Sequence, residues 1–249
     1  MNRGDAKARS AEEILFNRIS SEPLRLGGEN NWLLWQLADS AFPTGGFAHS
    51  AGLEAAWQHG EVRNRNELIS FMEANLHQIG RAALPFVMAA HAEPERLEEF
   101  DNLCDAFTTN HVANRASRAQ GKAFLSAVQR IFGERILNDD GTLKRTEVRA
   151  PSHFAPVFGA SLSRLNVPIE TTSRLFFFNH LRGILAAAVR LNIVGPMEAQ
   201  GLQHQLTATA DKVLETCGSL TLEDIAQTSP LLELWQGAQD RLYSRLFQS

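Results

Sequence analysis

The stretch "FPTGGFAHSAGLEAA", residues 42–56, contains a serine whose neighbours resemble a catalytic motif. Ser50 is followed by Gly52, and Ala48 stands where the nucleophile elbow Gly-x-Ser-x-Gly has its first glycine. That elbow exposes its serine at a sharp turn between a strand and a helix, beside an oxyanion hole, for acyl transfer. Here the preceding residues follow a helical run, and no alternating βα pattern supplies a sheet. A serine hydrolase that uses Ser50 therefore remains an alternative and is not the favoured interpretation.

Histidines and cysteines are the other residues that could do chemistry. The eight histidines form no H-x-x-x-H pair, and none lies beside a cysteine at ligand spacing. Cys104 and Cys217 lie far apart and show neither metal nor redox spacing, a usage that suits a reducing cytosol. We therefore expect no metal ligand, no cofactor and no catalytic residue in this chain.

The same stretch has the residues of a rigid turn between two helices. Pro43 disfavours helix at Phe42, and Gly45 and Gly46 can adopt positive φ or admit a second backbone. Ser50 can support the first turn of the helix that follows. Small side chains on that helix would permit tight contact with a neighbouring helix, and they are Ala48, Ala51, Gly52, Ala55 and Ala56. These residues favour a structural turn between two helices.

Apolar residues recur every three or four positions along most of the chain, which predicts helices and almost no strand. Further helices are expected at about 94–109, 111–132, 153–165, 169–192, 196–216 and 230–247. Residues 134–153 contain turn residues and a proline, and predict a surface loop. The predicted fold class is all-α: a single-domain helical bundle of about ten helices over residues 31–249, after an N-terminal arm, residues 1–30, that we expect to be flexible.

The net charge of the chain limits the kinds of partner that we expect. A net charge of −4 and a pI near 6.1 give no overall basic field, so we expect neither nucleic acid nor a membrane as a partner. The longest apolar stretch, residues 175–195, is interrupted by polar residues, which argues against a membrane span. On the helix expected at 111–132, Arg115, Arg118 and Lys122 can share one face. That face either docks an acidic partner or is merely solvated.

The final segment, "SPLLELWQGAQDRLYSRLFQS", predicts an amphipathic helix that starts at Pro230. Its apolar pattern continues to Leu246 and Phe247, although terminal segments normally fray unless they are tied down. Full burial would stabilise each of these side chains by roughly 1.5–3 kcal/mol. They must therefore be covered either by this chain's own core or by a partner.

Taken in order, these segments resemble the UreF family of urease accessory proteins over about residues 32–249. The resemblance rests on "LLWQLADSAFPTGGFAHSAGLEAA", "NRASRAQG", "VFGA" at 157–160, "AAAVRLNIVGP" at 186–196 and "RLYSRLFQS". The first of these carries His49, which resembles the plant-type branch of the family. Gln239 stands where the resemblance leads us to expect a histidine.

The resemblance implies an all-α, cytoplasmic homodimer without catalytic activity of its own. It implies binding to a UreD/UreH-type accessory protein and recruitment of a UreG-type GTPase. The complex would then deliver nickel to apo-urease as the GTPase hydrolyses GTP. It also implies that the C-terminal segment lies at a partner interface. A stand-alone nickel metallochaperone stays open as a further alternative.

Three groups of residues are expected to bind partners. The first shapes the elbow and its contacts, the second makes polar contacts, and the third is a C-terminal anchor in which an arginine offers a forked donor to carboxylate or carbonyl groups. The groups are Pro43, Gly45, Gly46, Phe47, Ser50, Gly52 and Glu54; Arg115 and Arg118; and Arg245, Leu246 and Phe247.

Overall fold

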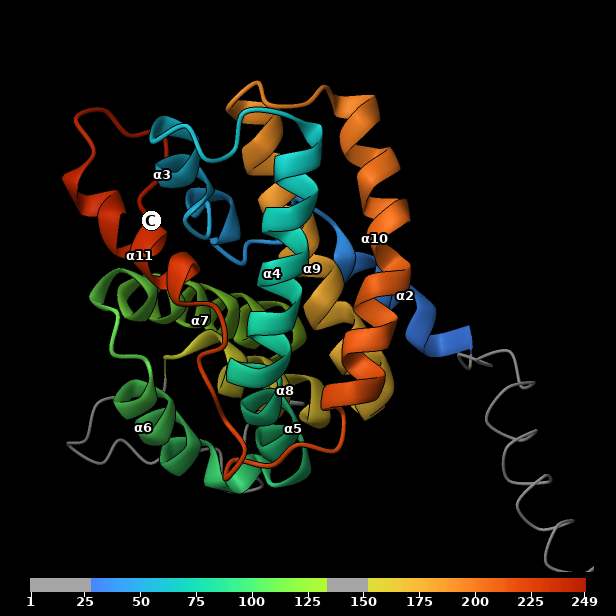
Figure 1. Ribbon diagram of the computed structural model, residues 1–249. Helices are drawn as coiled ribbons and strands as arrows, with labels where there is room; N and C mark the ends of the chain where they lie inside the picture. The colour runs from blue at the N-terminus through green and yellow to red at the C-terminus, as the bar shows by residue number, and fades with distance from the viewer. Residues whose placement is uncertain (1–27, 134–151) are drawn as a thin grey trace, which may run out of the picture. The chain divides into compact units, whose positions relative to one another are not determined.

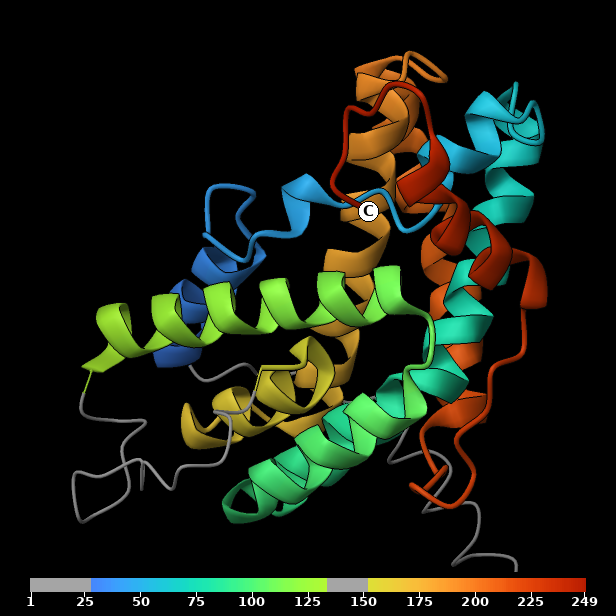
Figure 2. The same ribbon diagram turned by 90° about the vertical axis from the view of Figure 1, so that its left-hand side faces the viewer.

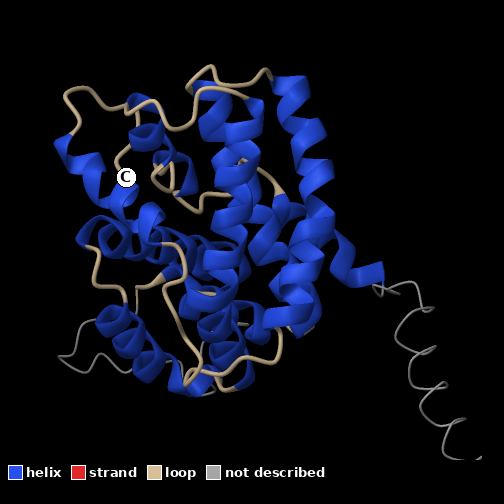
Figure 3. Cartoon of the chain, in the orientation of Figure 1, coloured by secondary structure: helices blue, strands red, loops and turns tan. Residues whose placement is uncertain are grey.

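A computed structural model of the chain describes residues 28–133 and 152–249 (Figure 1). The described residues form α-helices, short 3-10 turns and loops, and they contain no strand (Figure 3). The prediction of an all-α fold is confirmed. The expected arm falls almost wholly outside the described residues, and so does the loop expected at 134–153, so both remain predictions.

The chain divides into two compact units, Met1–Asp39 and Ser40–Ser249. In the first, helix α2 comprises Gly28–Ala38. This helix ends before Phe42 and Pro43, as the effect of proline on the preceding residue predicts. The start of the helical domain expected at residue 31 remains a prediction.

The helices of the second unit begin and end at signals that the sequence carries. Asn64 and Asn110 each accept two backbone N–H bonds from the helix that follows, which is the N-cap arrangement. Pro196 and Pro230 each stand as the first helical residue. The elements are η1 (Gly46–Ala48), α3 (Leu53–Gln58), α4 (Arg65–Ala82), α5 (Leu84–Ala92), η2 (Pro94–Arg96), α6 (Leu97–Phe107), α7 (His111–Phe132), α8 (Phe154–Arg164), α9 (Ile169–Arg190), α10 (Pro196–Cys217), α11 (Pro230–Ala238) and η4 (Gln239–Arg241).

Helix α8 forms the centre of the core, where it packs against both α5 and α7. Glycines allow this close approach, because a Cβ at Gly159 would collide with the carbonyl oxygen of Val87 on α5. Four phenylalanine rings join α7, α8 and α9, with centroids 5.2–5.9 Å apart: Phe124, Phe154, Phe158 and Phe176. Aromatic pairs at such distances add to the burial of their apolar area.

Three long helices, α4, α9 and α10, pack side by side (Figures 1 and 2). The C-terminal end of α9 lies beside η1 and α3. This arrangement brings residues near position 190 to the elbow, which we define as residues 42–52.

The C-terminal helix is shorter than predicted. Helix α11 ends at Ala238, η4 follows, and Leu242 has an extended backbone with φ −67° and ψ 136°. Residues 242–249, here called the tail, return to the elbow (Figure 2). The prediction of a helix to residue 247 is wrong because the polar groups of the tail bond to the elbow and α3 in place of a further helical turn.

The second correction concerns the small residues of the elbow. Ala51 and Gly52 have φ of 54° and 86°, which no α-helix contains, so α3 begins only at Leu53. Ala48 and Ala51 therefore do not lie on that helix, although Ala55 and Ala56 do.

Candidate docking site

The elbow is a fixed turn that two glycines make possible. Gly45 and Gly52 have positive φ, whereas Gly46 does not. A Cβ at Gly52 would lie 3.0 Å from the backbone nitrogen of Gln236, so α11 approaches the elbow closely at this point. Positive φ was predicted for Gly45 and Gly46 and occurs at Gly45 only. Gly52, which was expected inside a helix, has positive φ and also allows the close approach of α11.

Ser50 supports the start of α3. It is fully buried, and its Oγ accepts the backbone N–H of Glu54 at 3.4 Å. Its own N–H donates to the backbone oxygen of Ser249 at 2.5 Å. The hydroxyl thus serves as an acceptor inside the fold.

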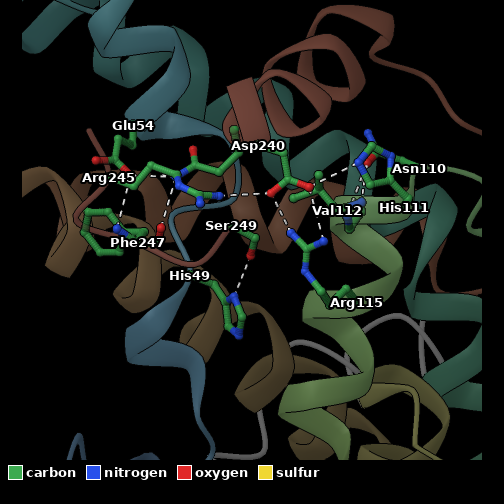
Figure 4. A network of polar contacts seen from close by, with 12 residues as sticks. His49, Glu54, Asn110, His111, Val112, Arg115, Asp240, Arg245, Phe247 and Ser249 are labelled. Carbon is green, nitrogen blue, oxygen red and sulfur yellow. Dashed lines mark hydrogen bonds and ion pairs between the residues drawn. The ribbon is translucent and has the colours of Figure 1, made fainter. Parts of the chain in front are cut away.

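Glu54 holds the tail with its carboxylate (Figure 4). The side chain is 1% exposed and accepts the backbone N–H of Leu246 at 2.6 Å and of Phe247 at 3.1 Å. The Nε2 of Gln239 donates to the same carboxylate at 2.6 Å. A charge can be buried at tolerable cost only when such donors surround it. Gln239 itself is fully buried, so a residue that the sequence marked only as a departure from the family contributes directly to the site.

Other bonds run along the length of the tail. The N–H of Gln248 donates to the carbonyl of Ala48 at 2.8 Å, and Gln58 Nε2 donates to the carbonyl of Ser244 at 2.9 Å. The Nδ1 of His49 lies 2.5 Å from Ser249 Oγ. Burial, with a smaller contribution from the charge of Arg115, lowers the pKa of His49 to about 4. At neutral pH this contact is therefore made by an uncharged imidazole.

Arg190, at the end of α9, connects the elbow to the tail. Its guanidinium carbon lies 4.2 Å from the ring centroids of both Phe47 and Phe247. Nη1 donates to the carbonyl of Phe47 at 2.9 Å, and Nη2 to that of Leu246 at 3.4 Å. Arg190 was not among the residues predicted to bind partners. The available signal was a charged residue inside an otherwise apolar stretch.

The two apolar residues of the tail have different surroundings. Phe247 is 4% exposed and is covered by its own chain, whereas Leu246 is 59% exposed. Phe47, on the other side of Arg190, is 70% exposed. Of the alternatives left open by the sequence, Phe247 thus belongs to the core. Leu246 and Phe47 remain available as apolar side chains on the surface.

The predicted cations are already paired within the chain (Figure 4). Arg115 makes a forked contact with Asp240, at 2.7 and 3.2 Å, and Arg245 reaches the same carboxylate at 3.1 Å. The bond from Arg115, with a smaller contribution from His111 at 3.2 Å, lowers the pKa of Asp240. Arg118 lies 3.7 Å from Asp105. Arg115 and Arg245 stay half-exposed, so each keeps surface that could face a partner.

A cavity of about 440 Å³ lies beneath the elbow. It is lined by elbow residues and by side chains from α4, α6, α7, α8, α9 and α11, and its surface is largely apolar. The elbow thus covers a hollow as well as touching the tail.

Neither a metal site nor a membrane-spanning helix is found among the described residues. Within 28–133 and 152–249, no group of three or more His, Cys, Asp or Glu side chains is placed to hold a metal ion. In the same ranges, no helix combines the length and the apolar character that crossing a bilayer requires.

Known proteins match this chain over most of its length. The UreF family model matches residues 62–207. A urease accessory protein F from Oryza sativa subsp. indica is 39% identical over 238 residues, which cover 92% of this chain and 90% of that protein. The urease accessory protein F of Arabidopsis thaliana is 38% identical over 224 residues, covering 88% and 92%. A urease accessory protein UreF from Trichodesmium erythraeum is 27% identical over 222 residues, covering 86% and 94%.

The family match covers more than half of the chain, and the plant relatives, 38–39% identical, cover 88–92% of it. The chain belongs to the UreF family of urease accessory proteins, which take part in urease maturation.

Proposed function

We propose that this chain is a non-catalytic maturation factor that bridges a UreD/UreH-type accessory protein and a UreG-type GTPase. In this role it helps nickel, the cargo of the complex, to reach apo-urease. Membership of the family supports the pathway. The structure supports the docking role through the surface that the elbow and the tail build together.

The main support is the presentation of Phe47 and Leu246. Both side chains are exposed, and both belong to backbone that hydrogen bonds hold in place. A leucine near a chain end that only fills its own core would be buried as Phe247 is. Large apolar side chains on fixed backbone are typical of sites where a partner excludes water. We infer that the UreD/UreH-type protein covers this surface.

The polar residues at the rim of this apolar surface, Arg115, Arg245 and Asp240, belong to the same proposal. Arg115 and Arg245 share Asp240, so two cations face one carboxylate. An acidic group on the partner could join this network at its exposed side, where arginine favours forked bonds to carboxylates. Rim contacts of this kind govern association rate and orientation more than affinity.

Two further features of the proposal are a homodimer and a cytoplasmic location. The homodimer follows from the family resemblance, and sedimentation of the purified chain tests it. The cytoplasmic location is supported by Cys104 and Cys217, which are both free thiols buried in the fold.

Reconstitution tests the proposed function. The full chain is purified together with the UreD/UreH-type protein, the GTPase and apo-urease of the same organism, with nickel and GTP. We expect a complex of the three accessory proteins and urease activity that depends on this chain. Activation that proceeds equally well without the chain would overturn the proposal.

The same preparation separates the alternatives. Turnover of an activated ester that disappears in Ser50→Ala would favour a serine hydrolase. Tight, stoichiometric nickel binding by the isolated chain, measured by calorimetry, would favour a metallochaperone.

A further inference from the structure

We propose that Glu54 and Arg190 act as a pair of positioning residues that fix the register of the tail, so that Leu246 points outward beside Phe47. This inference rests on the proposed docking function, because it names the residues that build the docking surface. Neither residue needs to touch the partner. Glu54 is buried beneath the tail, and Arg190 is bonded to its own chain.

The peptide of Leu246 is held from both sides. Its N–H donates to the Oε1 of Glu54 on α3, at 2.6 Å, and its carbonyl accepts from Nη2 of Arg190 on α9, at 3.4 Å. Two elements that lie more than a hundred residues apart in sequence therefore define the position of one residue.

Register matters because exposure alternates over the last four residues of the tail, 246–249. Leu246 and Gln248 are exposed, whereas Phe247 and Ser249 are buried. A slip of one residue would therefore exchange buried and exposed positions among these four residues. Leu246 would then point inward, and Phe247 would lose its place in the core.

The chemistry of position 54 requires a carboxylate. Two backbone N–H groups and one amide N–H converge on its two oxygens. A glutamine there would turn its own NH₂ toward at least one of these donors and leave that donor unpaired. Glu54→Gln therefore keeps the shape of the side chain and removes one of its two acceptor oxygens.

The chemistry of position 190 likewise requires arginine. Its planar guanidinium stacks between two aromatic rings and bonds to two carbonyls at once. A lysine keeps the charge, but it lacks the flat face and the fork. Because Arg190 is exposed, Arg190→Lys should leave the core intact.

Amide hydrogen exchange of the full chain measures the register directly. In Glu54→Gln and in Arg190→Lys, the amides of Leu246 and Phe247 should lose about tenfold or more of their protection, the equivalent of one charge-assisted hydrogen bond. The control is Arg174→Lys on the same helix, because Arg174 makes an exposed ion pair with Asp211 at 3.5 Å. That variant should exchange as the unmodified chain does.

A second readout connects register to docking. The dissociation constant for the UreD/UreH-type protein should rise about tenfold or more in both variants and should not change in Arg174→Lys.

Unchanged exchange at 246–247 in both variants would overturn the inference. So would faster exchange with unchanged affinity, because the register would then not serve docking. If the unmodified chain itself fails to bind that partner, the proposed function fails, and the exchange measurement still decides whether Glu54 and Arg190 set the register. If Glu54→Gln does not fold, Arg190→Lys alone decides.

Discussion

At the scale of single residues, two histidines are held uncharged inside the fold. Burial lowers the pKa of His180 on α9 to about 4, and His49 in the elbow has the same pKa. The Nε2 of His180 is buried and has no hydrogen-bond partner among the described residues. When the folded pKa lies below the unfolded value of 6.5, the unfolded state binds more protons between these two values. Stability from this source is present above pH 6.5 and is lost as pH falls toward 4.

This difference predicts how acid destabilises the protein. Between pH 7 and pH 5, His180 should cost about 2 kcal/mol of the free energy of unfolding. His180→Asn should reduce the loss over that interval by a similar amount, whereas His204→Asn, at an exposed position of α10, should not. Urea unfolding at the two pH values measures the difference. An equal pH dependence in the protein and in His180→Asn would contradict this account.

Gly52 is the residue on which the elbow geometry depends most directly. Alanine there would have to adopt φ of 86° and would approach Gln236 of α11 to 3.0 Å. Gly52→Ala should therefore lower the free energy of unfolding by about 1–3 kcal/mol. Gly201→Ala on α10 is the matched control, because its Cβ would meet open space. It should be neutral or stabilising by up to about 1 kcal/mol. Thermal unfolding compares the two, and equal effects would argue against a strained elbow.

At the scale of elements, local signals predicted the helices well. The expected helix at 111–132 agrees with α7, whose start is fixed by the Asn110 cap, and α11 begins at the predicted Pro230. These features depend on residues that are neighbours in sequence. The end of α11 could not be found in this way. Periodicity continues to Phe247, but the bonds from Glu54, some 190 residues earlier, draw the tail out of the helix.

Within the site too, local features were predictable from sequence, whereas contacts between distant segments were not. The turn at Gly45 was predicted because glycine and proline influence the backbone locally, whereas Gly52 was expected inside a helix. The pairing of Arg115 with Asp240, and the position of Arg190 between two rings, were not predicted. Such contacts join distant segments, and a single sequence gives no indication of which charges will meet.

At the scale of the whole molecule, the tail should be separable from the helical core. Removal of residues 243–249 deletes no helical residue, so circular dichroism should show nearly unchanged helix content. Capture of the UreD/UreH-type protein should be lost, because Leu246 and the bonds that order it are gone. A shortened chain that is captured as well as the full one would show that the tail does not dock. Collapse of the helix content would show that the tail mainly completes the core.

The central claim is that Phe47 and Leu246 form one surface that a partner covers. The measurement that tests it most directly is the affinity of the full chain for the UreD/UreH-type protein, with Phe47→Ser, Leu246→Ser and the control Met197→Ser, which changes an 86% exposed side chain on α10. We predict that each of the first two variants weakens binding about tenfold or more, as loss of a central apolar contact does, and that Met197→Ser binds normally. Normal binding by both Phe47→Ser and Leu246→Ser would contradict the claim.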